Sequence, residues 1–162
     1  DANGAFSPDT ALDKLKELSR FNIHSIEQPI KQGQWLDMYE LCRNTPLPIA
    51  LDEELITSDK FRIRTKADKQ ELIRSIYPQY IILKPSLVGG FSSSDEWIAA
   101  AENENIKWWI TSALEANVGL NAIAQYTATK NNPMPQGLGT GQLFENNTPS
   151  TLNIKGEKLY HH

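Results

Sequence analysis

The chain lacks most of the features that mark secreted, membrane-spanning and nucleic-acid-binding proteins. Its only cysteine, Cys42, excludes an internal disulfide and favours a reducing compartment, which we expect to be the cytoplasm. No apolar run approaches the length of about 18 residues that predicts a transmembrane helix, and no signal peptide is visible, so we expect no membrane partner. The formal net charge is −4, and no Lys/Arg cluster with interleaved aromatic residues is present, which argues against a nucleic-acid partner.

The length and composition fit one globular domain with a real core. The chain has 162 residues, of which 40% are hydrophobic and 22% charged. It is too short for a complete (β/α)8 barrel, which takes about 250 residues. Its abrupt opening on Asp1 is interpreted as a cut point rather than a natural start. The closing His161-His162 pair fits either a native end or the remnant of a purification tag.

Segments with helical spacing of apolar residues alternate with short apolar runs typical of buried parallel strands. Ser7 and Pro8 fit an N-cap and first turn, and the run from Ser92 to Glu96 predicts an acidic first turn for a later helix. Helices are predicted near residues 8–19, 35–42, 66–76, 97–103 and 120–129, and strands near 23–26, 48–51, 80–83 and 107–111, with a strand end at Asp1 and a further strand near Leu138.

This alternation predicts an α/β protein with a parallel sheet and right-handed crossovers. Spacing alone leaves open a barrel or a doubly wound sheet, although the glycine-rich stretch 137–141 lies at the wrong end of the chain for a dinucleotide-binding turn. We expect residues 1–141 to form the sheet and helices. Residues 142–162 are expected to be a polar, turn-rich tail that packs on or beyond them.

A polar residue ends each of four predicted strands, and the chain opens on a fifth polar residue at the strand end of Asp1. Asp1, Glu27, Asp52, Lys84 and Ser112 are separated by 26, 25, 32 and 28 positions. One strand-plus-helix unit of a barrel takes about 31 residues. Because the carboxyl ends of parallel strands meet on one face, we expect these side chains to converge there.

Three of these strand ends carry the carboxylates that Mg²⁺ prefers, namely Asp1, Glu27 and Asp52. Lys84 follows the run Tyr-Ile-Ile-Leu, where burial would lower its pKa and make it a usable base. A divalent ion beside an amine is a suitable arrangement for stabilising an enolate. The alternatives are that each acid is merely solvated and that Lys84 is a surface lysine.

Three other residue types are assigned structural roles. His24 is predicted to be a core or interface histidine, because a spacing of three in a strand points it away from the face of Glu27. Trp108 and Trp109 are interpreted as strand packing, and Cys42 as a buried structural thiol.

The ordered motifs resemble the enolase superfamily, and more narrowly its muconate-lactonising subgroup and the o-succinylbenzoate synthases within it. The likeness runs from Asp1 to about Gly141. It is carried by Asp-Ala-Asn at 1–3, Ile-Glu-Gln-Pro at 26–29, Leu-Asp-Glu-Glu at 51–54, Leu-Lys-Pro-Ser at 83–86 and Thr-Ser-Ala-Leu-Glu-Ala-Asn-Val-Gly-Leu at 111–120. The resemblance implies a TIM-type barrel, present here as about strands three to eight.

The resemblance also implies a role for each polar strand end. Asp1, Glu27 and Asp52 would bind Mg²⁺, with Mn²⁺ as a substitute, at the ends of barrel strands three, four and five. Lys84, on strand six, would face the reacting carbon. Near neighbours of the ligands would be Asn3 and Glu53, and the substrate's carboxylate groups would lie near Ser112, Gly89 and Gly90.

By the same resemblance, the reaction is a metal-assisted loss of water from a cyclohexadiene carboxylate, giving o-succinylbenzoate for menaquinone synthesis. An N-acylamino acid racemase or dipeptide epimerase of the same subgroup is the alternative, because it would use the same ligands and the same lysine.

The family carries a Lys-x-Lys motif with the general base on strand two, and a capping domain at the N-terminus. Neither is present in this sequence, so we expect the chain to need both as partners and to be inactive alone. A non-catalytic partial barrel that serves as an assembly partner remains a third hypothesis.

Overall fold

Helices and parallel strands alternate along the chain in the computed structural model, which describes residues 1–56, 63, 65–140 and 143–161. The order is α1 (Pro8–Ser19), β1 (Ile26–Glu27), α2 (Trp35–Asn44), β2 (Ile49–Leu51), the 3-10 turn η1 (Glu53–Leu55), α3 (Lys66–Ile76), β3 (Tyr80–Leu83), α4 (Gly90–Asn103), β4 (Lys107–Ile110), α5 (Asn117–Thr129), β5 (Leu152–Lys155) and β6 (Lys158–His161). In this described part, no helix is both long and apolar enough to cross a membrane.

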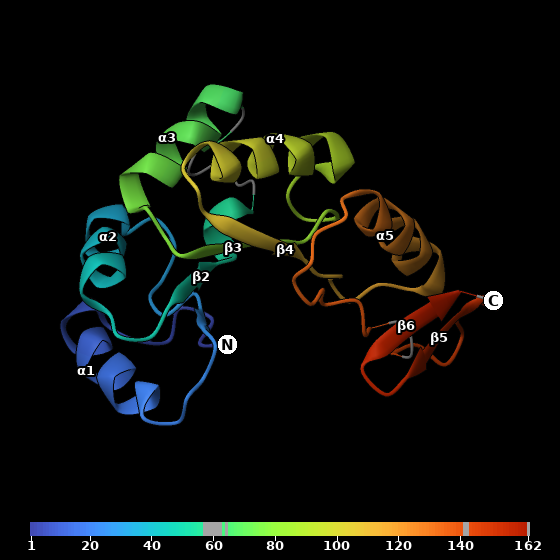
Figure 1. Cartoon of the computed structure of the whole chain (residues 1–162), viewed down its shortest axis with the longest axis horizontal. Coiled ribbons are helices and arrows are strands. Elements are labelled where there is room, and N and C mark those ends of the chain that lie inside the picture. Colours follow the sequence, from blue (N-terminus) through green and yellow to red (C-terminus); the bar gives the residue numbers. More distant parts are fainter. Residues whose placement is uncertain (57–62, 64, 141–142, 162) are drawn as a thin grey trace.

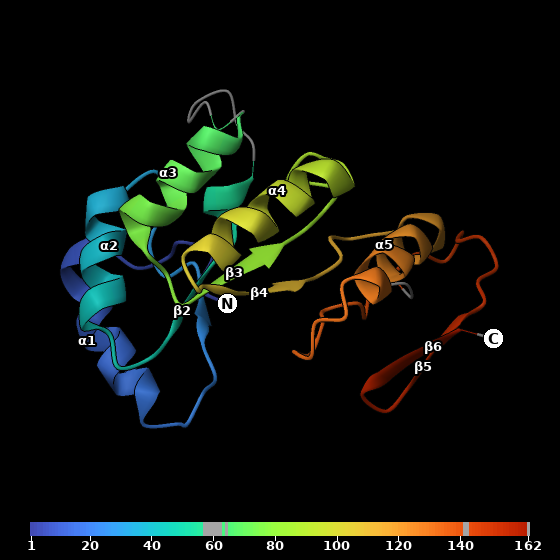
Figure 2. The same ribbon diagram turned by 45° about the horizontal axis from the view of Figure 1, so that its top comes forward.

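The first four strands form one parallel sheet in the order β1-β2-β3-β4. Figure 1 shows the sheet curving as an arc, with α1 to α4 on its convex side and the concave side open. Figure 2, turned by 45°, keeps the helices on that same side. Sequential order and parallel pairing are what a run of βα units produces, so the predicted parallel α/β arrangement is confirmed.

The core lies between the convex side of the sheet and the helices. All three residues of β2 are buried, which explains its uninterrupted apolar sequence. Helix α3 contributes Leu72, Ile73 and Ile76, and α4 contributes Trp97, all with no exposed surface. These helices repeat apolar residues at intervals of three and four because one face of each packs on the strands.

Some element boundaries differ from those that the sequence predicts. Strand β1 contains only residues 26 and 27, because the chain bends at His24, just before the strand. Helix α4 begins at Gly90, so Asp95 and Glu96 lie in its second turn and the predicted acidic first turn is wrong. Near Leu138 there is no strand among the described residues, only an isolated parallel bridge between Thr111 and Gly137.

The C-terminal region contains an antiparallel hairpin, β5–β6, that the sequence analysis did not predict. Its two strands are joined by Gly156 and Glu157, with Gly156 at a φ of +60°. A glycine in a two-residue turn between two short segments of alternating polarity is a sequence signal for a hairpin. The polar composition of this tail obscures that signal. Figure 1 shows the hairpin beside α5, beyond the end of the parallel sheet. The predicted boundary between residues 141 and 142, and most of the irregular stretch 55–64, lie outside the described residues.

Candidate active site

Three of the predicted strand-end residues meet at the carboxyl ends of neighbouring strands. Glu27 ends β1, Asp52 directly follows β2, and Lys84 directly follows β3. The Lys84 ammonium contacts Asp52 Oδ2, and its Nζ lies 3.3 Å from Glu27 Oε1. The parallel register, in which Glu27 pairs with Ala50 and Ala50 with Tyr80, brings the three strand ends to the same edge.

The three side chains differ in their contact with solvent. The Asp52 side chain is 2% exposed, whereas those of Glu27 and Lys84 keep 23% and 21%. Burial raises the pKa of Glu27, and the nearby Asp52 raises it further, while Lys84 opposes the shift. Oδ1 of Asp52 is buried and has no hydrogen-bond donor among the described residues. A buried carboxylate oxygen without a donor is a position where a cation would be stabilised.

The pKa of Lys84 does not follow the sequence-based expectation. Burial by itself lowers this pKa, as the sequence analysis anticipated. The hydrogen bonds and negative charges of Asp52 and Glu27 outweigh burial, so the net pKa lies above its ordinary value. In this arrangement Lys84 is an ammonium ion, and the expectation of a lysine with a lowered pKa is wrong.

The predicted strand end at Asp1 is wrong: no strand precedes α1 among the described residues, and Asp1 lies apart from the pair of carboxylates. The backbone N–H of Ala2 donates to the carbonyl of Glu27 at 3.0 Å, which places the segment of Asp1 directly beside β1. The Asp1 carboxylate is exposed and accepts the backbone N–H of Asn3 at 2.8 Å. Across residues 1–56, 63, 65–140 and 143–161, no three Asp, Glu, His or Cys side chains are gathered closely enough to hold a metal ion.

Glu53, the other predicted neighbour of the ligands, begins the 3-10 turn directly after Asp52. Its pKa is raised by burial, and the charge of Asp52 adds to the shift. Like Asp52 Oδ1, its Oε2 is buried without a hydrogen-bond donor among the described residues. A second buried carboxylate oxygen without a donor, directly after the proposed ligand Asp52, adds to the negative charge that a cation bound nearby would offset.

The predicted substrate-binding residues lie on the same edge of the sheet, in the loops that follow β3 and β4. Gly89 and Gly90 lead into α4 with φ values of +98° and +85°. Ser112 is buried, and its hydroxyl lies 3.2 Å from the carbonyl of Gly137 and 2.7 Å from the hydroxyl of Thr140. Their role in substrate binding stays a prediction.

Two buried polar residues beside the carboxylates, Gln28 and Glu54, were not among the predicted site residues. Gln28 has no exposed surface and Glu54 is 3% exposed. Gln28 belongs to the motif Ile-Glu-Gln-Pro and Glu54 to the motif Leu-Asp-Glu-Glu, but nothing in a single sequence shows that either side chain points inward.

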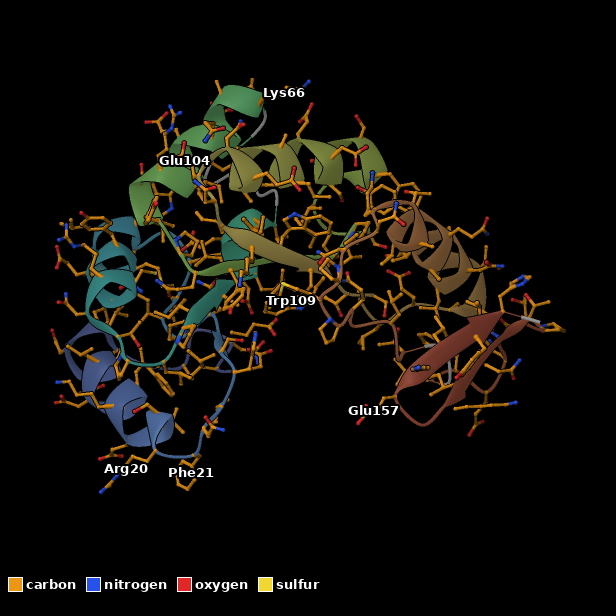
Figure 3. The ribbon with its side chains drawn as sticks, viewed as in Figure 1. Arg20, Phe21, Lys66, Glu104, Trp109 and Glu157 are labelled. Carbon is orange, nitrogen blue, oxygen red and sulfur yellow. The ribbon has the colours of Figure 1, made fainter. Side chains whose placement is uncertain are left out.

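One of the two positions predicted for His24 is wrong, whereas Trp108 and Trp109 lie in β4 and pack as predicted, Trp108 being buried. His24 is exposed rather than in the core, and its ring centroid lies 4.9 Å from that of Tyr80. The bend before β1 breaks the strand alternation on which the prediction for His24 relied. Figure 3 places Trp109 on the concave side of the arc, with its ring centroid 5.6 Å from that of Tyr80. Cys42 is buried as predicted, and burial raises the pKa of its thiol to about 12.

Comparison with known proteins gives a consistent result. Residues 1–158 match the family described as enolase C-terminal domain-like. The chain is 56% identical over 159 residues to an o-succinylbenzoate synthase of Desulfotalea psychrophila, covering 98% of this chain and 42% of that protein. It is 34% identical over 119 residues to an N-succinylamino acid racemase of Thermus thermophilus, covering 74% of this chain and 30% of that protein.

The solved structures agree with the sequence comparisons. The crystal structure of MenC from Desulfotalea psychrophila superposes with a TM-score of 0.92 at 56% identity, covering 98% of this chain and 43% of that one. A muconate cycloisomerase from Pseudomonas fluorescens superposes with a TM-score of 0.78 at 26% identity, covering 95% and 40%. The chain thus spans less than half the length of these relatives. It belongs to the enolase C-terminal domain-like family, and its fold is a partial TIM-type barrel of the enolase superfamily.

Proposed function

We propose that this chain is the barrel portion of a Mg²⁺-dependent o-succinylbenzoate synthase that acts in the cytoplasm, in menaquinone biosynthesis. The observation that carries the proposal is the convergence of Lys84, Glu27 and Asp52 at the ends of consecutive parallel strands. Its 56% identity to a protein named o-succinylbenzoate synthase supports this choice of reaction within the superfamily. The buried free thiol of Cys42 fits a reducing compartment.

Asp1, Glu27 and Asp52 would hold the Mg²⁺ ion, and Mn²⁺ would substitute for it. The donorless Oδ1 of Asp52 and the carboxylate chemistry of all three residues support this assignment. Asp1 is included because its segment is hydrogen-bonded to β1 beside Glu27. When bound, the ion supplies electrostatic stabilisation of the negative charge that develops on the substrate. Asn3 and Glu53 would orient the ligands that adjoin them.

Lys84 would act on the substrate as a fixed cation. Its raised pKa keeps the ammonium protonated at neutral pH, which suits stabilisation of an enediolate rather than removal of a proton. The substrate is a small carboxylate, and its carboxylate groups would lie near the loop of Gly89 and Gly90 and near Ser112. The general base would come from a Lys-x-Lys motif on an upstream strand.

That upstream portion, comprising strands one and two and a capping domain, is the proposed partner of this chain. Residues 2, 4 and 6 donate backbone hydrogen bonds to residues 27, 28 and 29 at 2.7–3.0 Å, so the segment of Asp1 already lies along β1. An upstream strand would continue this pairing and close the barrel.

The decisive experiment is a paired activity assay on a full-length protein that contains this chain. Formation of o-succinylbenzoate and racemisation of an N-succinylamino acid would be followed in parallel, with Mg²⁺ present. We expect dehydration, and we expect Lys84→Ala to lower its rate by about 10² to 10³, because an electrostatic contact to the developing charge is lost. Racemisation without dehydration would replace the synthase assignment with the second candidate, which the 34% identity to an N-succinylamino acid racemase favours.

The metal assignment has its own test. Isothermal titration with Mg²⁺ would compare the parent with Asp52→Ala, whose lost carboxylate should weaken binding about 10- to 100-fold or more. Equal affinity of the two proteins would remove Asp52 from the proposed ligand set.

A further inference from the structure

Gln28 and Glu54 are buried polar residues that take no part in the chemistry proposed above. Gln28 has no exposed surface and Glu54 only 3%. Burying an amide and a carboxylate is unfavourable unless both are hydrogen-bonded, so their partners indicate what the residues do.

The side-chain amide of Gln28 joins the end of β1 to the end of β2. Its Nε2 donates to the carbonyl of Ile30 at 3.0 Å. Its Oε1 accepts the backbone N–H of Asp52 at 3.2 Å and that of Glu54 at 3.4 Å. Only a group that donates and accepts can make all three contacts, so a carboxylate or thioether of similar length cannot replace the amide.

The backbone of Gln28 adds a third connection. Its N–H donates to the carbonyl of Ala50 at 3.0 Å, and its carbonyl accepts the N–H of Gly4 at 2.7 Å. Gln28 therefore contacts all three segments that carry the proposed ligands. It does so with a φ of +39°, in the left-handed region that a residue with a side chain keeps only where its surroundings enforce it.

Glu54 extends the same connection to the loop that follows β1. Its carboxylate accepts the backbone N–H of Gly33 at 2.8 and 3.1 Å and the indole N–H of Trp35 at 3.2 Å. The loop between β1 and α2 is thereby attached to the turn that follows Asp52.

We propose that Gln28 and Glu54 form a brace that sets the separation of the Glu27 and Asp52 carboxylates and thereby the affinity of the site for a divalent cation. Both are positioning residues, since neither touches the ammonium of Lys84 nor is expected to touch the ion. The inference rests on the proposed function, in which Glu27 and Asp52 are metal ligands. Side chains that orient metal ligands typically change the affinity about 10- to 100-fold when they are replaced.

The test compares Gln28→Met and Gln28→Glu with a matched control, Gln79→Met. Gln79 makes the same kind of bridge at the opposite end of β2, accepting the N–H of Ile49 at 2.9 Å and donating to the carbonyl of Cys42 at 3.0 Å. Mn²⁺ binding would be measured by electron paramagnetic resonance, and stability by urea unfolding. We expect the Gln28 variants to weaken Mn²⁺ binding about 10- to 100-fold and Gln79→Met to leave it within about twofold of the parent.

The control separates positioning from general destabilisation. If the parent binds Mn²⁺ and the two variants Gln28→Met and Gln79→Met weaken that binding equally, or neither weakens it, the brace is wrong. Gln28→Glu conserves the volume of the side chain, so it keeps the test decisive if Gln28→Met does not fold.

A second measurement, made without metal, distinguishes failure of the brace from failure of the proposed function. Amide hydrogen exchange at Asp52 and Glu54 should be about tenfold faster in Gln28→Met and unchanged in Gln79→Met. If the parent binds no Mn²⁺ and the exchange follows this pattern, the metal proposal fails while the brace between the strand ends stands. If the rate of amide exchange at Asp52 and Glu54 is unchanged in Gln28→Met, the brace is wrong whether or not the parent binds Mn²⁺.

Discussion

The Lys84 ammonium lies between the two carboxylates that we propose as metal ligands. A positive charge at that position opposes a second cation, because charges a few ångströms apart interact by about 1 to 4 kcal/mol at effective dielectric constants of 80 to 20. Lys84→Met should therefore raise the affinity for Mn²⁺ several-fold while it lowers the rate of dehydration in the full-length protein by about 10² to 10³. Calorimetric titration measures the first effect.

Lys107→Met is the control for this substitution. Lys107 is exposed at the first position of β4, at the opposite edge of the sheet from Lys84. Lys107→Met changes the net charge by the same amount as Lys84→Met. An equal gain in affinity for Mn²⁺ would therefore show that the overall charge, not the position of Lys84, is responsible.

Gly4 lies where the segment of Asp1 passes closest to the loop after β1. Its φ is +70°, and a Cβ added there would lie 2.9 Å from the backbone Cα of Lys31. Gly4→Ala must both adopt a left-handed conformation and displace this backbone, so we expect a loss of about 2 to 4 kcal/mol in the free energy of unfolding.

Gly156→Ala is the matched comparison for Gly4→Ala. Gly156 also has a positive φ, +60°, but an added Cβ would meet no atom within 4 Å. Gly156→Ala should lower the free energy of unfolding only by the cost of the left-handed conformation, about 1 to 2 kcal/mol. Urea unfolding measures both variants, and equal losses would contradict the predicted collision at Gly4.

At the scale of elements, a buried lysine joins α3 to α4. Lys69 is 3% exposed, and its Nζ donates to Glu96 Oε2 at 2.7 Å, to Ser93 Oγ at 2.6 Å and to the Ser93 carbonyl at 3.3 Å. The ammonium also lies 5.6 Å from the ring centroid of Trp97. A quarter of the Glu96 side chain is exposed, so water can solvate this carboxylate if the pair is broken. The buried Lys69 ammonium has no such access to water and therefore depends more on the ion pair.

This asymmetry predicts unequal effects of breaking the pair from its two sides. Glu96→Gln leaves a buried ammonium without its counterion and should cost about 2 kcal/mol. Lys69→Met leaves a carboxylate that water can reach and should cost less than about 1 kcal/mol. Urea unfolding at neutral pH would measure both, and a larger loss for Lys69→Met would contradict this account.

The pair also predicts a pH dependence of stability. The hydrogen bond from Lys69 holds the pKa of Glu96 below its ordinary value. A carboxyl whose pKa is lower in the folded state stabilises the fold above its ordinary pKa, and this contribution is lost as the pH falls through the folded pKa. The difference in stability between the parent and Glu96→Gln should therefore shrink when unfolding is measured at pH values from about 5 down to about 3.

The helices and strands were largely predictable, and the two main errors have physical causes. The acidic pair Asp95-Glu96 predicts a start of α4 that is too late, because Gly89, at φ +98°, ends the preceding loop earlier. The sequence does not predict the hairpin β5–β6, because its strands are short and polar and most of their residues are exposed. Alternation of apolar and polar residues is weak where neither face is buried.

At the scale of the whole molecule, the parallel sheet is an open arc (Figure 1), and Trp109 lies on its concave side (Figure 3). His24, Tyr80 and Trp109 lie within 4.9–6.1 Å of one another between ring centroids. Trp109 is half-buried, whereas Trp97, behind the sheet, has no exposed surface. In a closed barrel the concave side would be its packed interior.

We therefore expect the upstream portion to cover Trp109. Acrylamide should quench the fluorescence of Trp109 in the 162-residue chain more strongly than in the full-length protein, with Trp109→Phe identifying the signal. The chain alone should show no dehydration above background, because the proposed base is upstream. Dehydration by the chain alone would contradict the assignment of that base.

The third hypothesis, a non-catalytic assembly partner, makes a different prediction. A chain that functions by association would sediment as a larger species in a concentration-dependent manner and would bind Mg²⁺ no better than Asp52→Ala. Sedimentation of the parent, together with the titration described above, distinguishes this hypothesis from the synthase.

The class of fold and the order of the site residues along the chain follow from the sequence alone. The spacing of Glu27, Asp52 and Lys84 equals one βα unit per step, and a parallel sheet can place such residues only at one edge. Three features appear only in the folded chain, namely the raised pKa of Lys84, the separate position of Asp1 and the burial of Gln28 and Glu54. These depend on distances between segments far apart in the chain, and such distances are set by packing rather than by local pattern.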